Sequence, residues 1–249
     1  MYKDFAYAYD RLMNDVPYSD WAGYYAKLLE LYDIRPNARC IECACGTGNL
    51  TIHLSKLGFR ITGVDLSPDM LNIAQQKARE HGVSIPFVRM DMRKLTVQRP
   101  IDAVLATCDG PNYLTASNDL LSFFQHAYTA LKPDGVLAFD ISTPYKLSER
   151  LGDRMFTTSD EDLVYVWQGQ YHKNKAILDI HMDIFIKETS GLYRRIQEDQ
   201  QQKAHDRSEI SDLLTKAGYT DIWFFGDRTM DAPDPEALRW HVTARKGAS

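Results

Sequence analysis

Between residues 39 and 141 the chain alternates short apolar runs with longer segments of helical periodicity. The apolar runs are bounded by turn residues, and we expect them to be buried strands. They are Arg39–Cys43, Arg60–Val64, Ile85–Val88, Ile101–Leu105 and Val136–Ile141. Between them, Pro68–His81 and Asn118–Leu131 each carry one apolar stripe at helical spacing. Such strand–helix–strand alternation predicts a parallel sheet with helices on both faces.

The two ends of the chain extend this pattern. Two helices are predicted within residues 1–35, around Tyr2–Met13 and Trp21–Tyr32. Near the other end, Arg207–Ala217 predicts a helix, and Tyr219–Phe225 and Leu238–Arg245 predict strands. The predicted fold is therefore α/β, a Rossmann-like doubly wound sheet of seven mostly parallel strands.

Residues 145–205 interrupt the core with a different period. Apolar residues occupy every second position from Leu178 to Ile186, which is typical of a strand with one buried face. Leu163–Tyr171 and Leu192–Gln202 are suitable antiparallel neighbours. We therefore predict a core of residues 1–144 and 206–249 with a helical cap (1–35), and a three-stranded antiparallel insertion (145–205). This insertion would cover the substrate or form a homodimer contact.

Charge and hydropathy along the sequence disfavour several classes of function. Asp and Glu number 34 against 29 Lys and Arg, a net charge of −5, which disfavours nucleic acid as a partner. No apolar run has the length of a membrane span, and the charged N-terminus does not resemble a signal peptide, so we expect a cytoplasmic protein.

Cys40, Cys43 and Cys45 crowd one short segment, where we expect them to pack as small hydrophobic residues and to bind no metal.

The first predicted strand leads into a turn of small residues, Cys43–Gly48, which we call the glycine turn. A helix follows it. Such a turn lets the backbone approach a ligand closely, and the helix start offers N–H groups to an anion. A dinucleotide fingerprint would need Gly or Ala three residues after Gly48, where the chain has Thr51. This difference weakens a nicotinamide or flavin interpretation.

Acidic residues follow the next two strands. Asp65 ends the second strand, where a carboxylate can accept hydrogen bonds from both hydroxyls of a ribose. Asp91 follows the third strand between Met90 and Met92, where it can take an adenine amino group while the methionines cover the ring. Together with the glycine turn, this edge of the sheet predicts a site for an adenosine with a short polar tail.

The order and spacing of four blocks resemble the class I S-adenosylmethionine-dependent methyltransferases. The blocks are Glu42–Gly48, Gly63–Leu71, Asp91–Met92 and Leu131–Gly135. Phe5–Asp10 and Cys108–Leu114 are similar to a small-molecule branch of that class, which includes the bacterial proteins of the YqeM type. One departure is Ala44, because the family usually has glycine there, and a positive φ at this residue would cost about 1 kcal/mol.

The resemblance implies S-adenosylmethionine as the cofactor and assigns residues to it. The implied cofactor-binding residues are Glu42, Ala44, Gly46, Gly48, Asp65, Leu66, Met70, Asp91, Met92, Cys108, Tyr9 and Tyr18. The implied activity is methyl transfer to a small-molecule N or O nucleophile.

Two alternatives remain open at this stage. One is a non-catalytic S-adenosylmethionine-binding or assembly protein, and the other is an RNA or protein methyltransferase, which the net charge disfavours. Residues expected on the substrate side are Asp109, Tyr113, Tyr145 and His181. None of them is assigned a catalytic role, and the acceptor stays unidentified.

Overall fold

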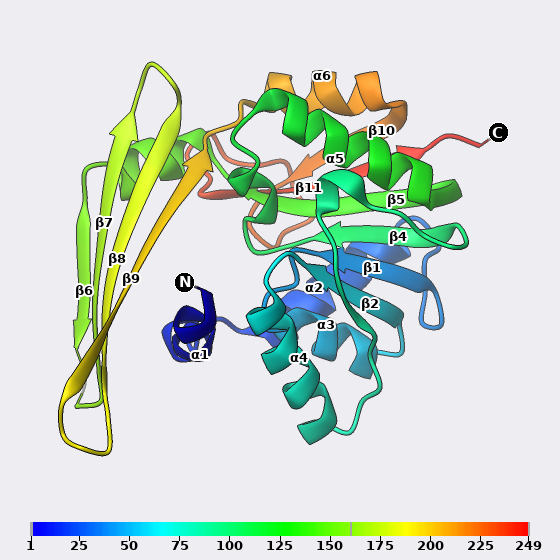
Figure 1. The fold of residues 1–249 in the computed structure, drawn as a ribbon. Coiled ribbons are helices and arrows are strands. Elements are labelled where there is room, and N and C mark those ends of the chain that lie inside the picture. Colours follow the sequence, from blue (N-terminus) through cyan, green and yellow to red (C-terminus); the bar gives the residue numbers. More distant parts are fainter. Residues whose placement is uncertain (1, 160, 249) are drawn as a thin grey trace.

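The computed structural model describes residues 2–159 and 161–248 and contains two separate sheets (Figure 1). The larger sheet is built from β1 (Arg39–Cys43), β2 (Arg60–Asp65), β3 (Phe87–Arg89), β4 (Ile101–Ala106), β5 (Leu131–Ser142), β10 (Tyr219–Phe225) and β11 (Arg239–Lys246). These seven strands lie in the order β10-β11-β5-β4-β1-β2-β3, and only β11 runs antiparallel to its neighbours. The predicted doubly wound, mostly parallel sheet is confirmed.

The helices begin and end close to where the sequence places them. They are α1 (Tyr2–Leu12), α2 (Tyr18–Glu30), α3 (Asn49–Lys56), α4 (Pro68–Glu80), α5 (Ser117–Ala130) and α6 (Arg207–Ala217), with short turns η1 (Met92–Lys94), η2 (Gly110–Tyr113) and η3 (Lys146–Leu151). At the start of α4, the Ser67 side chain accepts a hydrogen bond from the Met70 amide, and Pro68 takes the first helical position. Gly218 ends α6 with a φ of 103°.

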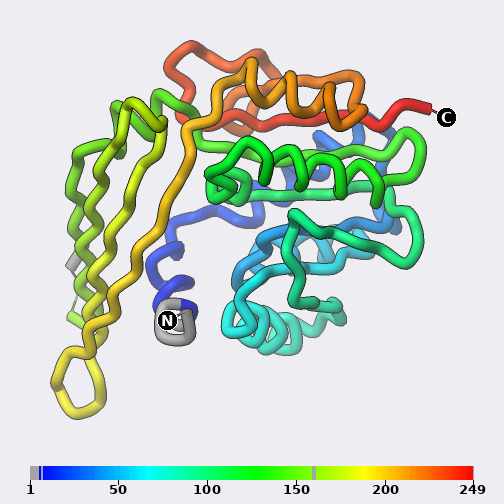
Figure 2. The backbone as a smooth tube through the Cα atoms, turned by 45° about the horizontal axis from the view of Figure 1, so that its top comes forward, coloured from blue at the N-terminus to red at the C-terminus, as the bar shows by residue number. Residues whose placement is uncertain are grey.

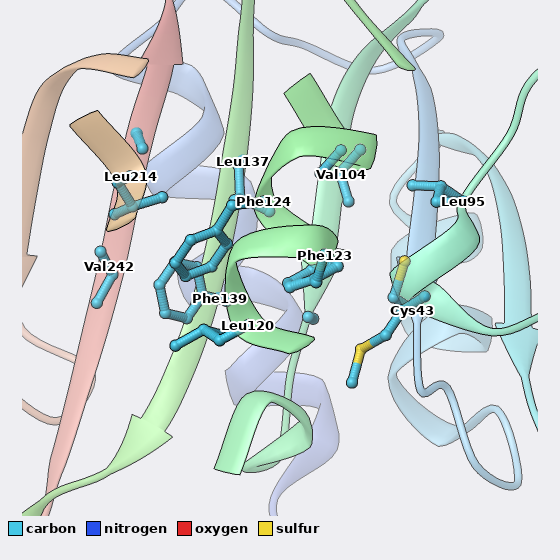
Figure 3. Packing of buried hydrophobic residues seen from close by; sticks show 14 of the residues in the cluster. Cys43, Leu95, Val104, Leu120, Phe123, Phe124, Leu137, Phe139, Leu214 and Val242 are labelled. Carbon is cyan, nitrogen blue, oxygen red and sulfur yellow. The ribbon is translucent and has the colours of Figure 1, made fainter. Parts of the chain in front are cut away.

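Alternate residues of each central strand pack on opposite faces of the sheet. On one face, α5 and α6 bury Phe123, Phe124 and Leu214 against strand residues such as Phe139 (Figure 3). On the other face, α2 and α3 bury an apolar layer that includes Tyr25. This double layer fixes the strand ends, where a ligand would bind.

Two of the three cysteines near β1 pack on opposite faces of the sheet because of the same alternation. Cys40 packs in the layer beneath α2 and α3, whereas Cys43 packs in the layer beneath α5. Both are buried and free, as is Cys45. Within residues 2–159 and 161–248, no group of three His, Cys, Asp or Glu side chains is arranged to hold a metal ion.

The insertion forms an antiparallel sheet of four strands, whereas the sequence predicted three. The strands are β6 (Met155–Ser159), β7 (Leu163–His172), β8 (Ile177–Lys187) and β9 (Tyr193–Lys203), in that order across the sheet. The additional strand is β6, which pairs only with β7 at the sheet edge. Its short sequence has no alternating pattern, and Phe156 packs on Trp167 with ring centroids 5.3 Å apart. Pairing with β7 therefore creates a strand that local sequence does not predict.

The second sheet stands beside the core, with α1 between them (Figures 1 and 2). Ala6 and Ala8 of α1 are buried in one cluster with Met70 of α4 and with Ile180 and Met182 of β8. Because α1 packs on both sides, it joins the insertion to the core. In the part of the chain that the structure describes, no helix combines the length and the apolar character that a membrane span requires.

Candidate functional site

A pocket of about 750 Å³ lies at the carboxyl ends of β1, β2 and β4. In this sheet the chain runs from β1 outward to β3 and then returns to β4 on the other side of β1. Open α/β sheets bind ligands at such a reversal of strand order. The structure brings eleven of the twelve predicted cofactor residues to the pocket wall: Tyr9, Tyr18, Glu42, Ala44, Gly46, Asp65, Leu66, Met70, Asp91, Met92 and Cys108.

Gly48 is the predicted residue that does not line this pocket. It has a φ of 75° at the start of α3, and a Cβ added there would lie 2.9 Å from the Ala74 Cβ and 3.0 Å from the Phe87 ring. Gly48 therefore lets α3 pack closely against α4 and β3. Gly46 differs, because a Cβ at that position would meet no atom within 4 Å. Its open side leaves room for a ligand against the backbone.

Ala44 adopts the left-handed conformation, with a φ of 52°. This conformation costs an alanine about 1 kcal/mol, which a glycine would avoid. The Ala44 methyl group also faces Gly110, where an added Cβ would lie only 3.3 Å away. The absence of a side chain at Gly110 therefore leaves room for the Ala44 methyl group.

Glu42 is buried beneath the glycine turn, with 2% of its surface exposed. Its carboxylate accepts hydrogen bonds from the hydroxyls of Thr51 in α3 and Thr107 after β4, the latter at 2.7 Å. Burial raises the pKa of Glu42 to about 7, although both hydroxyls lower it. Glu42 therefore joins three elements at the pocket floor and titrates near neutral pH.

Asp65 connects the glycine turn to the start of α4 through its two carboxylate oxygens. Oδ2 accepts from the Gly46 amide and Oδ1 from the Ser67 amide, each at 2.9 Å. Burial raises the pKa of Asp65, and the backbone N–H groups oppose that rise. Each oxygen keeps a further lone pair for a ligand hydroxyl. The next residue, Leu66, lines the pocket with 56% of its surface exposed, so its side chain is available for apolar contact with a ligand.

The carboxylate of Asp91 is already engaged by Arg93. Arg93 Nη2 lies 2.7 Å from Asp91 Oδ2, and Nε lies 3.0 Å from both carboxylate oxygens. The same guanidinium donates to Asp119 at 3.0 Å. Hydrogen bonds from Arg93 hold the pKa of Asp91 below its usual value. Arg93 lines the pocket and was not predicted, although it follows Asp91 by two residues.

Two successive residues of the loop after β4 have left-handed backbone, Cys108 with φ 54° and Asp109 with φ 64°. The buried Asp140 carboxylate stabilises this shape, because it accepts from the Cys108 amide at 2.8 Å and the Asp109 amide at 3.0 Å. Arg239 donates hydrogen bonds to the carboxylates of Asp109 and Asp140. The positive charges of Arg239 and Lys146 hold the pKa of Asp109 well below its usual value, although burial opposes this effect. This network presents Cys108 to the pocket.

Of the four residues expected on the substrate side, only Tyr113 lines this pocket. Asp109 is held by Arg239, and Tyr145 donates to Glu236 at 3.1 Å on the surface. His181 lines a neighbouring hollow. Further wall residues that the sequence did not predict include Thr107, Gly110 and Gln200.

Comparison with known proteins indicates that this chain is a methyltransferase. A family profile described as a methyltransferase domain matches residues 40–135. A Geobacillus protein and YqeM of Bacillus subtilis, both methyltransferases by name, are 35% and 34% identical to this chain; the matches cover 98% and 99% of it and 99% and 97% of the relatives. A solved S-adenosylmethionine-dependent methyltransferase from Clostridium acetobutylicum is 27% identical, with a TM-score of 0.89 over 99% of both chains.

The fold, the pocket and these similarities define an S-adenosylmethionine-dependent methyltransferase of class I. Within that class, the chain belongs to the methyltransferase family that includes YqeM. This assignment favours an enzyme over the non-catalytic binding protein that the sequence left open.

Proposed function

We propose that this enzyme transfers the methyl group of S-adenosylmethionine to a small-molecule acceptor through a nitrogen or oxygen nucleophile. The observation that carries the proposal is the enclosure of the pocket. Strand ends form its floor, while Tyr9 of α1, Tyr18 of α2 and Gln200 of β9 complete its wall. A concave pocket whose wall includes side chains from these three elements favours a small acceptor over a macromolecule.

The residues of the pocket fit the nucleoside part of the cofactor. The unused lone pairs of Asp65 would accept hydrogen bonds from the ribose hydroxyls, beside the open side of Gly46. Leu66 and Met92 offer apolar contact to the adenine ring. Asp91 would accept from the adenine amino group while Arg93 holds its carboxylate in place.

The opposite end of the pocket fits the amino acid part. Burial raises the pKa values of Tyr9 and Tyr18, so both phenols remain protonated, and a ligand carboxylate would accept a hydrogen bond from this pair. When bound, the cofactor supplies an electrophilic methyl group on a sulfonium. Ala44 and Cys108 would border that region, and the protein contributes orientation and the exclusion of water.

The test is methyl transfer from S-adenosylmethionine with a deuterated methyl group in a metabolite extract divided by molecular size. We expect the label in the low-molecular-weight fraction, detected by mass spectrometry, and its loss with Asp65→Ala. Label found only in the protein or RNA fraction would exclude a small-molecule acceptor.

A further inference from the structure

A second hollow of about 720 Å³ adjoins the cofactor pocket and shares Tyr113 and Gln200 with it. It lies across the neighbouring strands β7, β8 and β9, and we call it the side groove. Because β9 is an edge strand of the insertion, the groove extends from the outer face of this sheet to the turn η2, which carries Tyr113. The hydroxyl of Tyr113 donates to Oε1 of Gln200 at 3.0 Å, so this contact lies at the boundary of the two cavities.

Two cross-strand rows of polar side chains form the floor of the side groove. In one row Gln168 pairs with His181, which pairs with Asp199, and in the next Gln170 pairs with Asp179, which pairs with Gln201. Residues two apart on a strand share a face, so all six side chains belong to one surface. The buried apolar residues of β8 lie on the opposite face.

Hydrogen bonds within the rows orient these side chains. Gln201 Nε2 donates to Asp179 Oδ1 at 2.8 Å, and His172 Nε2 lies 2.8 Å from the other oxygen of that carboxylate. His181 Nδ1 lies 2.5 Å from Asp199 Oδ1. Amide and carboxylate groups held in this way still have free lone pairs, and the amides have free N–H donors.

The charge of the groove selects against anions. Among the described residues that line it there are two carboxylates and no Lys or Arg. A phosphate or carboxylate would have to bind without the guanidinium or ammonium partner that usually receives it. Neutral hydroxyl groups can both donate to the carboxylates and accept from the amides.

We propose that the side groove binds the distal part of the acceptor, and that this part is rich in hydroxyl groups and carries no phosphate or carboxylate. The reacting atom would then reach the cofactor pocket past the contact between Tyr113 and Gln200. This inference rests on the proposed methyl transfer to a small molecule and adds the chemical class of the acceptor.

The test uses the full chain loaded with S-adenosylhomocysteine, whose binding is measured first by calorimetry. Two probes are then titrated by ligand-observed NMR: maltose as a neutral polyol and glucose 6-phosphate as an anion. We expect maltose to bind about fivefold or more tightly than glucose 6-phosphate, the equivalent of roughly one hydrogen bond.

Two groove variants, Gln170→Ala and Asp179→Asn, should each weaken maltose binding about fivefold and leave the affinity for S-adenosylhomocysteine unchanged. The matched control is Gln197→Ala, because Gln197 lies on the same face of β9 outside the groove. The inference is overturned if maltose does not bind, if glucose 6-phosphate binds more tightly, or if the groove variants behave like the control. If S-adenosylhomocysteine itself does not bind to the unaltered protein, the proposed function fails instead.

Discussion

Lys77 Nζ lies 2.6 Å from Oδ2 of Asp10, and this ion pair ties α4 to α1. The other oxygen of Asp10 accepts from the Thr47 hydroxyl at 2.6 Å and from Asn49 Nδ2 at 3.0 Å. One carboxylate thus connects the N-terminal helix, the glycine turn and α4. Because Tyr9 precedes Asp10 and lines the pocket, the position of this helix determines how the pocket is closed.

Replacing Lys77 with Met should loosen α1 and weaken the binding of S-adenosylhomocysteine about fivefold, since a partly buried ion pair contributes roughly 1 kcal/mol. Calorimetry measures the affinity, and hydrogen exchange of residues 2–12 should become faster. Lys216→Met in α6 is the control, because Lys216 is exposed and lines neither pocket. Equal affinities for both variants would show that the ion pair does not hold the helix over the site.

Asp65→Asn should weaken the binding of S-adenosylhomocysteine about tenfold or more, because it replaces charge-assisted hydrogen bonds with neutral ones. The new amide nitrogen would also face the N–H group of either Gly46 or Ser67, both of which now donate to the carboxylate. Asp212→Asn on the exposed side of α6 should bind normally. An unchanged dissociation constant for Asp65→Asn in a protein with normal circular dichroism would remove Asp65 from the cofactor site.

Ala44→Gly should raise the free energy of unfolding by about 1 kcal/mol, since glycine adopts a positive φ without steric cost. Ala176 offers a matched comparison, because it has a φ of 51° in the turn before β8, outside the pocket. Urea denaturation should show a gain for both glycine variants, whereas only Ala44→Gly should change the affinity for S-adenosylhomocysteine. A change of affinity in both, or in neither, would contradict a role for the Ala44 methyl group at the site.

The sequence predicts the parts of this molecule that depend on local pattern. Buried strands, the Ser67 cap and the positions of Asp65 and Asp91 follow from periodicity and turn chemistry over short distances. Gly48 shows the limit of such reasoning, because its spacing in the glycine turn is the same whether it contacts a ligand or packs against Ala74.

Contacts between distant residues are not predictable in this way. Arg239 reaches Asp109 across 130 positions of the chain, and Gln200 comes from the insertion to meet Tyr113. Neither Arg239 nor Gln200 belongs to a local motif. The contact of Arg239 depends on the pairing of β11 with β5, and the contact of Gln200 depends on the placement of β9. The strand β6 was missed for a related reason, since its partner β7 creates it.

The pH dependence of stability should report on Glu42, whose pKa rises from 4.5 to about 7 on folding because the group is buried. Between these two values the folded state retains a proton that the unfolded state has lost, so the free energy of unfolding falls as pH increases. The contribution of Glu42 is complete below pH 4.5 and lost above pH 7, and a shift of this size corresponds to about 3 kcal/mol. Glu42→Gln, which cannot titrate, should flatten this part of the profile when urea denaturation is compared at several pH values, whereas the exposed Glu30→Gln should keep it. Parallel profiles for the unaltered protein and Glu42→Gln would show that Glu42 is ionised in the folded state throughout this range.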